Sequence, residues 1–377
     1  MPDTINVGIV GASFMGRAHS NGYLDVAHYF DLPKPPALQA VCDINKESGE
    51  ALAKQYGWKS VETDWHTLIQ RDDIDLVDIC TSNNLHMPIA VEAAKNGKHL
   101  ICEKPLCMGA DEAQKMLDAA QDANVRHMTA FNYRRVPALV LAKKMIEDGK
   151  IGKIHHFNAV YYQDWLVDPN FPYVWRHDVS VGGSGAHGDM NAHTVDLARF
   201  LVGEFEAVTA AQETFIKERK KPDGSTGKVT VDDALFFMAK FQNGAMGNFM
   251  ATRYATGRKN FLRLEIFGSK GSLMFNLERM NELDYFSRED ESYAQGFRNI
   301  VVTEGEHPYL DRWWPPGHII GWEHTFIHEI GDLLTAIANG ENVQADFYDG
   351  LRCQQVLDAA WESSLNKKWI EIPDATL

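Results

Sequence analysis

Short apolar runs alternate with helix-like segments along the first third of the chain. In open sheets built this way, strands run parallel and helices cover both faces. Ligands then bind beyond the carboxyl ends of the strands. The pattern predicts strands at residues 4–10, 38–42, 59–61, 75–80, 99–102 and 126–131, and helices at 17–27, 45–56, 65–70, 87–96 and 110–123.

A different pattern begins after residue 131. A helix over 137–148 leads into alternating apolar and polar runs joined by turns that contain glycine, which indicates a mostly antiparallel sheet. The chain of 377 residues is also too long for one typical core. We therefore predict a doubly wound domain over 1–131 and an open-sheet domain over 132–377. The expected strands of the second domain are 154–163, 207–216, 233–242, 245–255, 263–267, 271–276 and 284–286.

The glycine-rich segment 182–203 carries ionisable residues in a helix-like pattern. Asp189, His193 and Asp196 follow each other at i, i+4 and i+7, a spacing that stays on one face of a helix. This stripe predicts a reactive edge. The alternative is a capped helix with a solvated polar edge.

The first strand ends in a turn of the dinucleotide-binding type. Gly11, Ser13, Phe14, Met15 and Gly16 lie between that strand and the next helix, the context that a dinucleotide fingerprint requires. Gly11 would allow a tight turn, and Gly16 would allow close packing of the helix. We predict that these five residues contact a pyrophosphate, although Ser13 stands where the motif has its middle glycine.

Asp43 follows the second strand, where a carboxylate could accept hydrogen bonds from ribose hydroxyls. The same charge would repel a 2′-phosphate, so we predict NAD rather than NADP. The alternative role for Asp43 is the N-cap of the helix over 45–56.

Composition narrows the class of protein. The chain is 45% hydrophobic and 24% charged, with a formal net charge of −15. The net charge is negative, and the lysines and arginines are scattered rather than clustered. Both features argue against nucleic acid or an anionic membrane as a partner. Neither a signal peptide nor a membrane-spanning run is visible, so we expect a cytoplasmic protein. Its five cysteines form no CxxC pair, which favours buried thiols over disulfides or a zinc site.

Three motifs together resemble one enzyme family. Thr81-Ser82-Asn83-Asn84-Leu85-His86, Glu103-Lys104-Pro105 and the Asp189, His193, Asp196 set are similar to those of the glucose–fructose oxidoreductase / inositol dehydrogenase family. The resemblance extends over nearly the whole chain, including 349–369. It departs at Ser82, where proline is usual, and at Asn191, where glycine is usual. Within the family, the Gln163-Asp164-Trp165 and Trp175-Arg176 segments resemble those of the inositol, L-glucose and levoglucosan dehydrogenases.

The resemblance implies a sugar or polyol dehydrogenase that uses NAD. Lys104 becomes a residue of the catalytic site and a hydroxyl-stabilising donor. An imidazole titrates near neutrality, so His193 is expected to be the general acid/base, with Asp189 orienting it or binding a hydroxyl. The expected cofactor contacts outside the glycine turn are Asp43, Thr81, Asn83, His86, Glu103 and Lys104. The expected substrate contacts besides Lys104, Asp189 and His193 are Tyr133, Gln163, Trp165, Arg176 and His318.

The resemblance also implies a homo-oligomer, a dimer or tetramer, assembled through the open sheet. The net charge favours a neutral sugar or cyclitol, such as an inositol, L-glucose or levoglucosan, over a sugar phosphate. Two alternatives of another class stay open. One is a NAD-binding regulator that senses sugars without catalysis. The other is a metal-dependent hydrolase that uses His187, Asp189 and His193, whereas the dehydrogenase needs no metal.

Overall fold

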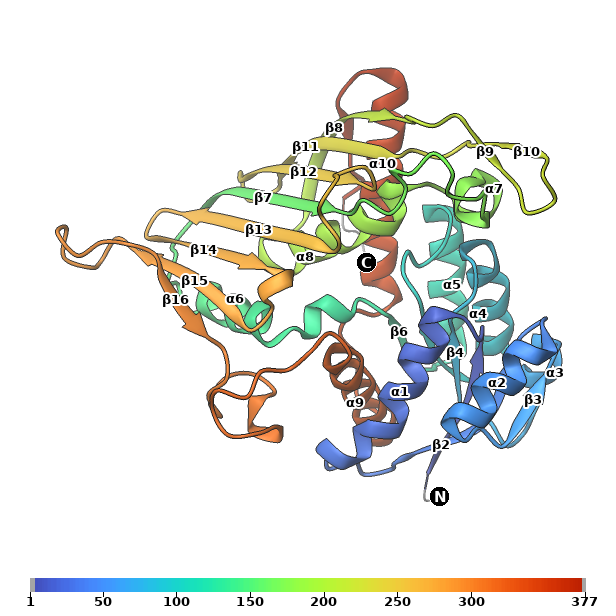
Figure 1. The fold of residues 1–377 in the computed structure, drawn as a ribbon. Helices are drawn as coiled ribbons and strands as arrows, with labels where there is room; N and C mark the ends of the chain where they lie inside the picture. The colour runs from blue at the N-terminus through green and yellow to red at the C-terminus, as the bar shows by residue number, and fades with distance from the viewer. Residues whose placement is uncertain (1–3, 375–377) are drawn as a thin grey trace. The chain divides into compact units, whose positions relative to one another are not determined.

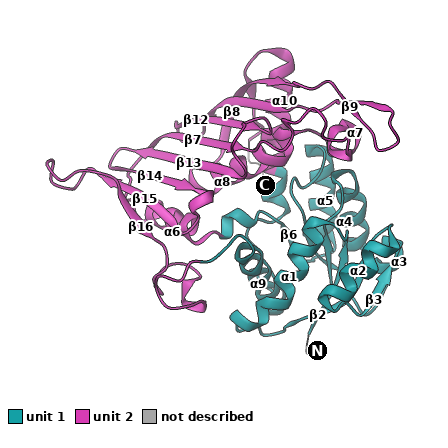
Figure 2. Ribbon diagram, in the orientation of Figure 1, with its two compact units in different colours: residues 1–135, 320–351 teal, residues 136–319, 352–377 magenta. Residues whose placement is uncertain are grey.

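The computed structural model describes residues 4–374, which form two compact units (Figure 2). Unit 1 contains the chain up to Arg135 together with Ile320–Leu351. Unit 2 contains Val136–Ile319 and the chain from Arg352 onward. The first unit is therefore discontinuous in sequence, and no motif in the sequence indicates this.

Unit 1 is a doubly wound parallel sheet (Figure 1). In the described residues its six strands are ordered β3-β2-β1-β4-β5-β6, the order expected of a dinucleotide-binding fold. The strands are β1 (Ile5–Val10), β2 (Pro36–Cys42), β3 (Ser60–Glu62), β4 (Leu76–Ile79), β5 (His99–Cys102) and β6 (His127–Thr129). The helices are α1 (Phe14–Tyr29), α2 (Lys46–Tyr56), α3 (Trp65–Ile69), α4 (His86–Lys95), α5 (Ala110–Asp122) and α9 (His324–Asn339).

The strands of unit 1 are apolar because helices cover both faces of the sheet. Val77, Ile79 and Leu100 are fully buried in one core with the apolar faces of α4 and α5. Far along the chain, α9 packs closely against α1. A Cβ on Gly22 would lie 2.7 Å from Ile330 Cδ1, so this glycine permits the approach of the two helices.

Unit 2 is built on a mostly antiparallel sheet, as predicted. Within the described range its order is β16-β15-β14-β13-β7-β12-β11-β8-β17, and the pair β7 and β12 is parallel. The bounds are β7 (Ile154–Tyr162), β8 (Phe205–Glu213), β11 (Ala234–Phe241), β12 (Met246–Thr252), β13 (Phe261–Gly268), β14 (Gly271–Asn276), β15 (Glu282–Ser287), β16 (Arg298–Val301) and β17 (Ile370–Glu371). A small separate hairpin pairs β9 (Glu218–Lys220) with β10 (Thr226–Lys228).

Helices pack against this sheet, in part through α6 (Pro137–Glu147), which contacts β14 and β15, and α8 (Ala192–Leu201), which contacts β7 (Figure 1). The remaining helices are α7 (Val179–Gly182) and α10 (Phe347–Asn366), whose residues from Arg352 belong to unit 2. Large apolar side chains stay exposed on the sheet. Phe236, Met238 and Met246 retain 40%, 49% and 50% of their accessible surface.

All five cysteines are buried, and none of them forms a disulfide. Across residues 4–374, no helix combines the length and the apolar character needed to cross a membrane.

Candidate functional site

The turn between β1 and α1 has the backbone of a phosphate-binding loop. Gly11 has φ +108°, and a Cβ there would lie 2.5 Å from the Cys80 carbonyl oxygen. A Cβ on Gly16 would lie 2.0 Å from the Gly11 carbonyl oxygen. Both positions therefore require glycine. Helix α1 begins at Phe14, three residues earlier than predicted, with Ser13 as its N-cap.

The first turn of α1 is accessible to a ligand. Ser13 and Phe14 are exposed and Met15 is half-buried, while the first N–H groups of a helix lack acceptors within the helix. The Phe14 ring stacks on Trp322, with centroids 5.5 Å apart and planes 10° apart. The turn therefore combines N–H donors with an aromatic shelf.

Asp43 lies beside this turn, at the end of β2. Its Oδ2 accepts a hydrogen bond from the Ala12 N–H (2.8 Å), and its Oδ1 accepts one from the Asn45 N–H (2.8 Å). The alternative interpretation of Asp43 as a helix cap is wrong. Asn45 is the N-cap of α2, and its side chain accepts from the Ser48 N–H.

The loop after β4 is joined to the loop after β5 through His86. This residue is fully buried, with Nδ1 3.1 Å from the Pro105 carbonyl oxygen and Nε2 3.2 Å from that of Thr81. Burial lowers the pKa of His86, so the ring is neutral at neutral pH. Thr81 and Asn83 are half-buried in the same loop. The structure thus places His86 inside the protein, between the two loops.

Glu103, Lys104 and Pro105 follow β5. Glu103 is buried and accepts, through Oε2, the backbone N–H of Lys104 (3.1 Å). Lys104 is half-buried, and its peptide bond to Pro105 is cis. Tyr133 is buried in a short turn over Asn132–Arg135 at the end of this part of unit 1.

In unit 2 the segment that carries Asp189 and His193 is not one regular helix. A π-helical turn spans His187–Asn191, and α8 begins at Ala192. A π turn holds more residues than an α turn and is frequent at functional sites, so the assumed period of about 100° per residue does not hold across it. Asp196 is buried to 1% exposure, so it does not extend a solvated edge.

Asp189 pairs with an arginine that the sequence analysis overlooked. Arg253 Nη2 lies 2.7 Å from Asp189 Oδ2; the arginine side chain is 2% exposed and the carboxylate 30%. The guanidinium also lies over the Trp165 ring, 5.2 Å from its centroid. Arg253 directly follows β12 and continues the face of Phe249 and Ala251, which are buried. Alternation along the strand is therefore the signal that could have identified it.

A continuous set of contacts joins this pair to His193. Trp165 Nε1 donates to Gln163 Oε1 (2.8 Å), and Gln163 Nε2 donates to Asn260 Oδ1 (3.0 Å). The Tyr161 hydroxyl donates to the same Asn260 oxygen (2.7 Å). The Tyr161 ring lies 6.0 Å from that of His193. Four predicted residues, Gln163, Trp165, Asp189 and His193, therefore belong to one connected cluster.

The other predicted residues of unit 2 make contacts of their own. Arg176 is half-buried and stacks over the Trp175 ring, 4.3 Å from its centroid. His318 is exposed on a loop, where its Nδ1 lies 2.7 Å from the Pro315 carbonyl oxygen. His187 is buried, with Nε2 2.8 Å from the Leu357 carbonyl oxygen and Nδ1 3.1 Å from Asn191 Nδ2. Both nitrogens of His187 are thus engaged away from Asp189, which leaves the hydrolase hypothesis unsupported.

Comparison with known proteins identifies both halves of the chain. Residues 5–131 match the NAD-binding Rossmann fold of an oxidoreductase family, and residues 139–274 match the GFO/IDH/MocA C-terminal domain. Levoglucosan dehydrogenase of Pseudarthrobacter phenanthrenivorans is 43% identical over 98% of this chain and 98% of its own length.

Solved structures are equally similar. An oxidoreductase domain protein from Kribbella flavida has a TM-score of 0.96 at 48% identity, covering 98% of this chain and 100% of that one. Levoglucosan dehydrogenase in complex with NADH and levoglucosan has a TM-score of 0.95 at 44% identity, covering 98% and 99%.

Proposed function

Because the chain belongs to the glucose–fructose oxidoreductase / inositol dehydrogenase family, we propose that it oxidises a secondary alcohol of a neutral sugar or cyclitol with NAD. The observation that carries this proposal is the unit 2 cluster, which connects His193 to the Asp189–Arg253 pair through Gln163 and Trp165. Such a cluster combines a proton acceptor with several hydroxyl-binding groups.

Unit 1 fits NAD. Gly11 and Gly16 leave no room for a side chain, so the backbone of the turn can approach a pyrophosphate at the start of α1. Asp43 ends β2 with its carboxylate fixed by two backbone N–H groups, which suits two ribose hydroxyls and opposes a 2′-phosphate. When bound, NAD supplies the hydride acceptor for the oxidation.

The chain supplies proton transfer and charge stabilisation. His193 is the general base for the substrate hydroxyl and the general acid in the reverse direction. Lys104 is proposed to stabilise negative charge that develops on the substrate. Asp189, paired with Arg253, accepts hydrogen bonds from a second hydroxyl or orients His193.

Charge favours a neutral substrate. Arg134 and Arg135 are buried and paired with Asp349 and Asp332, at 2.9 Å and 2.8 Å, so neither is an exposed site for a phosphate. The relative that is 43% identical is named for levoglucosan, and we propose an anhydrosugar of this kind as the first substrate to test. Tyr133, Arg176 and His318 stay proposed substrate contacts. We also propose that residues 1–131 bind the cofactor and that residues 132–377 bind the substrate and form the oligomer.

The exposed apolar side chains on the unit 2 sheet support a homo-oligomer, with Phe236, Met238 and Met246 in its interface. Light scattering across micromolar concentrations would show a dimer or tetramer. A monomer throughout that range would remove this part of the proposal.

A substrate panel tests the function. NADH formation is followed with levoglucosan, L-glucose, glucose, myo-inositol and scyllo-inositol, with NAD and with NADP, and with EDTA added in a parallel series. We expect turnover of at least one polyol with NAD, unchanged by EDTA. Binding of NADH without turnover of any polyol would favour a sugar-sensing regulator. Loss of turnover on addition of EDTA would favour a metal-dependent enzyme.

A further inference from the structure

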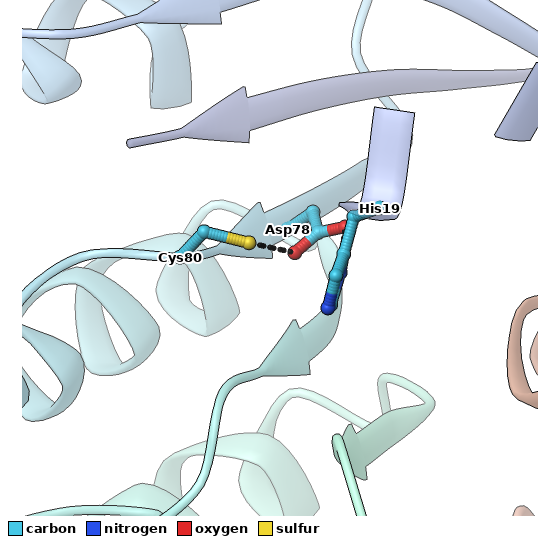
Figure 3. Close-up of side chains that lie close together, drawn as sticks. All are labelled: His19, Asp78 and Cys80. Atoms are coloured by element: carbon cyan, nitrogen blue, oxygen red, sulfur yellow. Dashed lines mark hydrogen bonds and ion pairs between the residues drawn. The ribbon is translucent and has the colours of Figure 1, made fainter. Parts of the chain in front are cut away.

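His19 is completely buried in α1, with a carboxylate at hydrogen-bond distance from each ring nitrogen. Its Nδ1 lies 2.8 Å from Asp78 Oδ2, and its Nε2 lies 3.0 Å from Glu103 Oε1. Figure 3 shows His19 and Cys80 approaching the Asp78 carboxylate. An ionised carboxylate only accepts hydrogen bonds, so both ring nitrogens carry protons. His19 is then an imidazolium between two carboxylates.

These hydrogen bonds continue to the backbone of Lys104. Glu103 uses Oε1 toward His19 and Oε2 toward the Lys104 N–H, which lies 3.1 Å away. The chain of contacts runs from β4 through α1 to the loop after β5, across sequence separations of 59 and 84 residues. The position of Lys104 therefore depends on a residue in the first helix.

The surroundings enclose His19 and change its pKa. Burial alone would lower the pKa of His19, but the charge of Asp78 raises it, and the net pKa lies well above the usual value. The Cys80 thiol donates to Asp78 Oδ1 (3.2 Å). From α9, burial raises the pKa of Glu329 to about 8, so that carboxyl is mostly neutral at pH 7. Tyr23, also buried, has a pKa raised by burial.

We propose that His19 is a positioning residue for Lys104: as a buried imidazolium it fixes the Glu103 carboxylate, whose second oxygen fixes the Lys104 backbone. This rests on the proposed dehydrogenase function, in which Lys104 stabilises the developing alkoxide. His19, Asp78 and Cys80 also offer ligand atoms within 4.8 Å of one another. However, the 2.8 Å and 3.2 Å separations from Asp78 are those of direct hydrogen bonds, which favours protons over a metal ion.

Replacing the ring tests the positioning role. His19→Gln loses the charge and one of the two carboxylate contacts, so we expect kcat to fall about 10- to 100-fold, as a displaced catalytic group does, with little change in KM for NAD. In a Lys104→Ala background the same replacement should cost less than about twofold, because the residue through which His19 acts is gone. Full additivity of the two losses would overturn the proposal.

One further variant separates positioning from general stability. His328→Gln is the matched control, because His328 is another fully buried histidine of unit 1, bonded to the Arg135 carbonyl oxygen. It should lower stability without lowering kcat. A kcat loss in this control equal to that of His19→Gln would also contradict positioning.

A measurement independent of turnover examines the charge itself. In protein labelled with ¹⁵N-histidine, the His19 signals, assigned by their loss in His19→Gln, should report two protonated nitrogens at pH 8. A neutral ring, or one equivalent of tightly bound metal in the purified protein, would overturn the proposal. If wild-type protein oxidises no polyol, the proposed function fails, and this spectrum still decides whether the imidazolium exists.

Discussion

Two charged networks, one in each unit, differ in how completely they are enclosed. In unit 1, His19, Asp78 and Glu103 have side chains that are 0%, 0% and 6% exposed. In unit 2, Arg253 is 2% exposed, but its partner Asp189 keeps 30% of its surface. An enclosed network can only hold structure in place, whereas a half-open one can also bind a ligand. The comparison therefore supports the proposed positioning role of the unit 1 network and the proposed substrate contact of the unit 2 network.

The largest expected effect comes from the open network. His193→Ala removes the proposed acid/base, and kcat should fall about 10²- to 10⁴-fold, the usual contribution of positioned proton transfer. Stopped-flow and steady-state assays with the best polyol measure the loss, and circular dichroism checks the fold. His66→Ala, an exposed histidine on α3, is the control. A loss below about tenfold with the fold intact would place the base elsewhere.

The Arg253–Asp189 pair should affect both stability and activity. Arg253→Met leaves Asp189 without its cation and Trp165 without its stacked guanidinium, so we expect unfolding to become easier by about 3 kcal/mol. Urea unfolding measures this, and kcat/KM should fall as well because Asp189 loses its orientation. Arg253→Lys keeps the charge but not the planar fork, and should recover part of the stability.

If Asp189→Asn costs the same with Arg253 present as in Arg253→Met, the two residues are not coupled. The Asp189–Arg253 pair would then have no role in the proposed site, and the difference in enclosure would no longer indicate a difference in role between the two networks.

The enclosed network should instead show itself in the pH dependence of stability. Burial first, then Glu103 and Asp78, raise the pKa of Glu329 from the usual 4.5 to about 8, against the opposing charges of His19 and Arg135. Between these values the folded state binds more protons than the unfolded state, so stability falls as pH rises from 4.5 to 8 and levels off above it.

Glu329→Gln removes this titration. Relative to wild type, the variant should gain stability between pH 5 and pH 8, by an amount on the order of 2–4 kcal/mol, with little change in kcat. Urea unfolding at several pH values measures the gain. Glu341→Gln, at an exposed position of the same unit, should follow the wild-type profile. Parallel profiles for Glu329→Gln and wild type would show that this carboxyl is ionised in the folded protein.

The sequence reveals short motifs but not the two charged networks. The glycine turn, Asp43 and Glu-Lys-Pro are short motifs at strand ends, and the predicted bounds of β5 and β14 agree with the structure. The networks escape such reading because their members meet only after folding. Asp189 and Arg253 are 64 residues apart, and His19 and Glu103 are 84 apart.

Irregular backbone geometry could not be predicted from the sequence either. The π turn at His187–Asn191 adds residues to a helical turn without any change in composition. Helix α9 joins unit 1 from beyond residue 319, and its apolar face does not reveal which unit it will cover. The pattern of apolar and polar residues therefore predicted the helices and strands better than it predicted which of them pack together.

Asp43 offers the smallest and sharpest expected effect, because its charge is proposed to act on one part of the cofactor, the ribose hydroxyls. Asp43→Ala should lower the ratio of kcat/KM for NAD to that for NADP about 10- to 100-fold, the value of charged hydrogen bonds to the ribose and of lost repulsion. Assays with both cofactors measure it. Asn45→Ala is the matched control: it removes the cap of α2 and about 1 kcal/mol of stability but leaves cofactor preference unchanged. If preference is also unchanged in Asp43→Ala, the carboxylate serves only to hold the Ala12 N–H, and it belongs with the enclosed residues that fix structure.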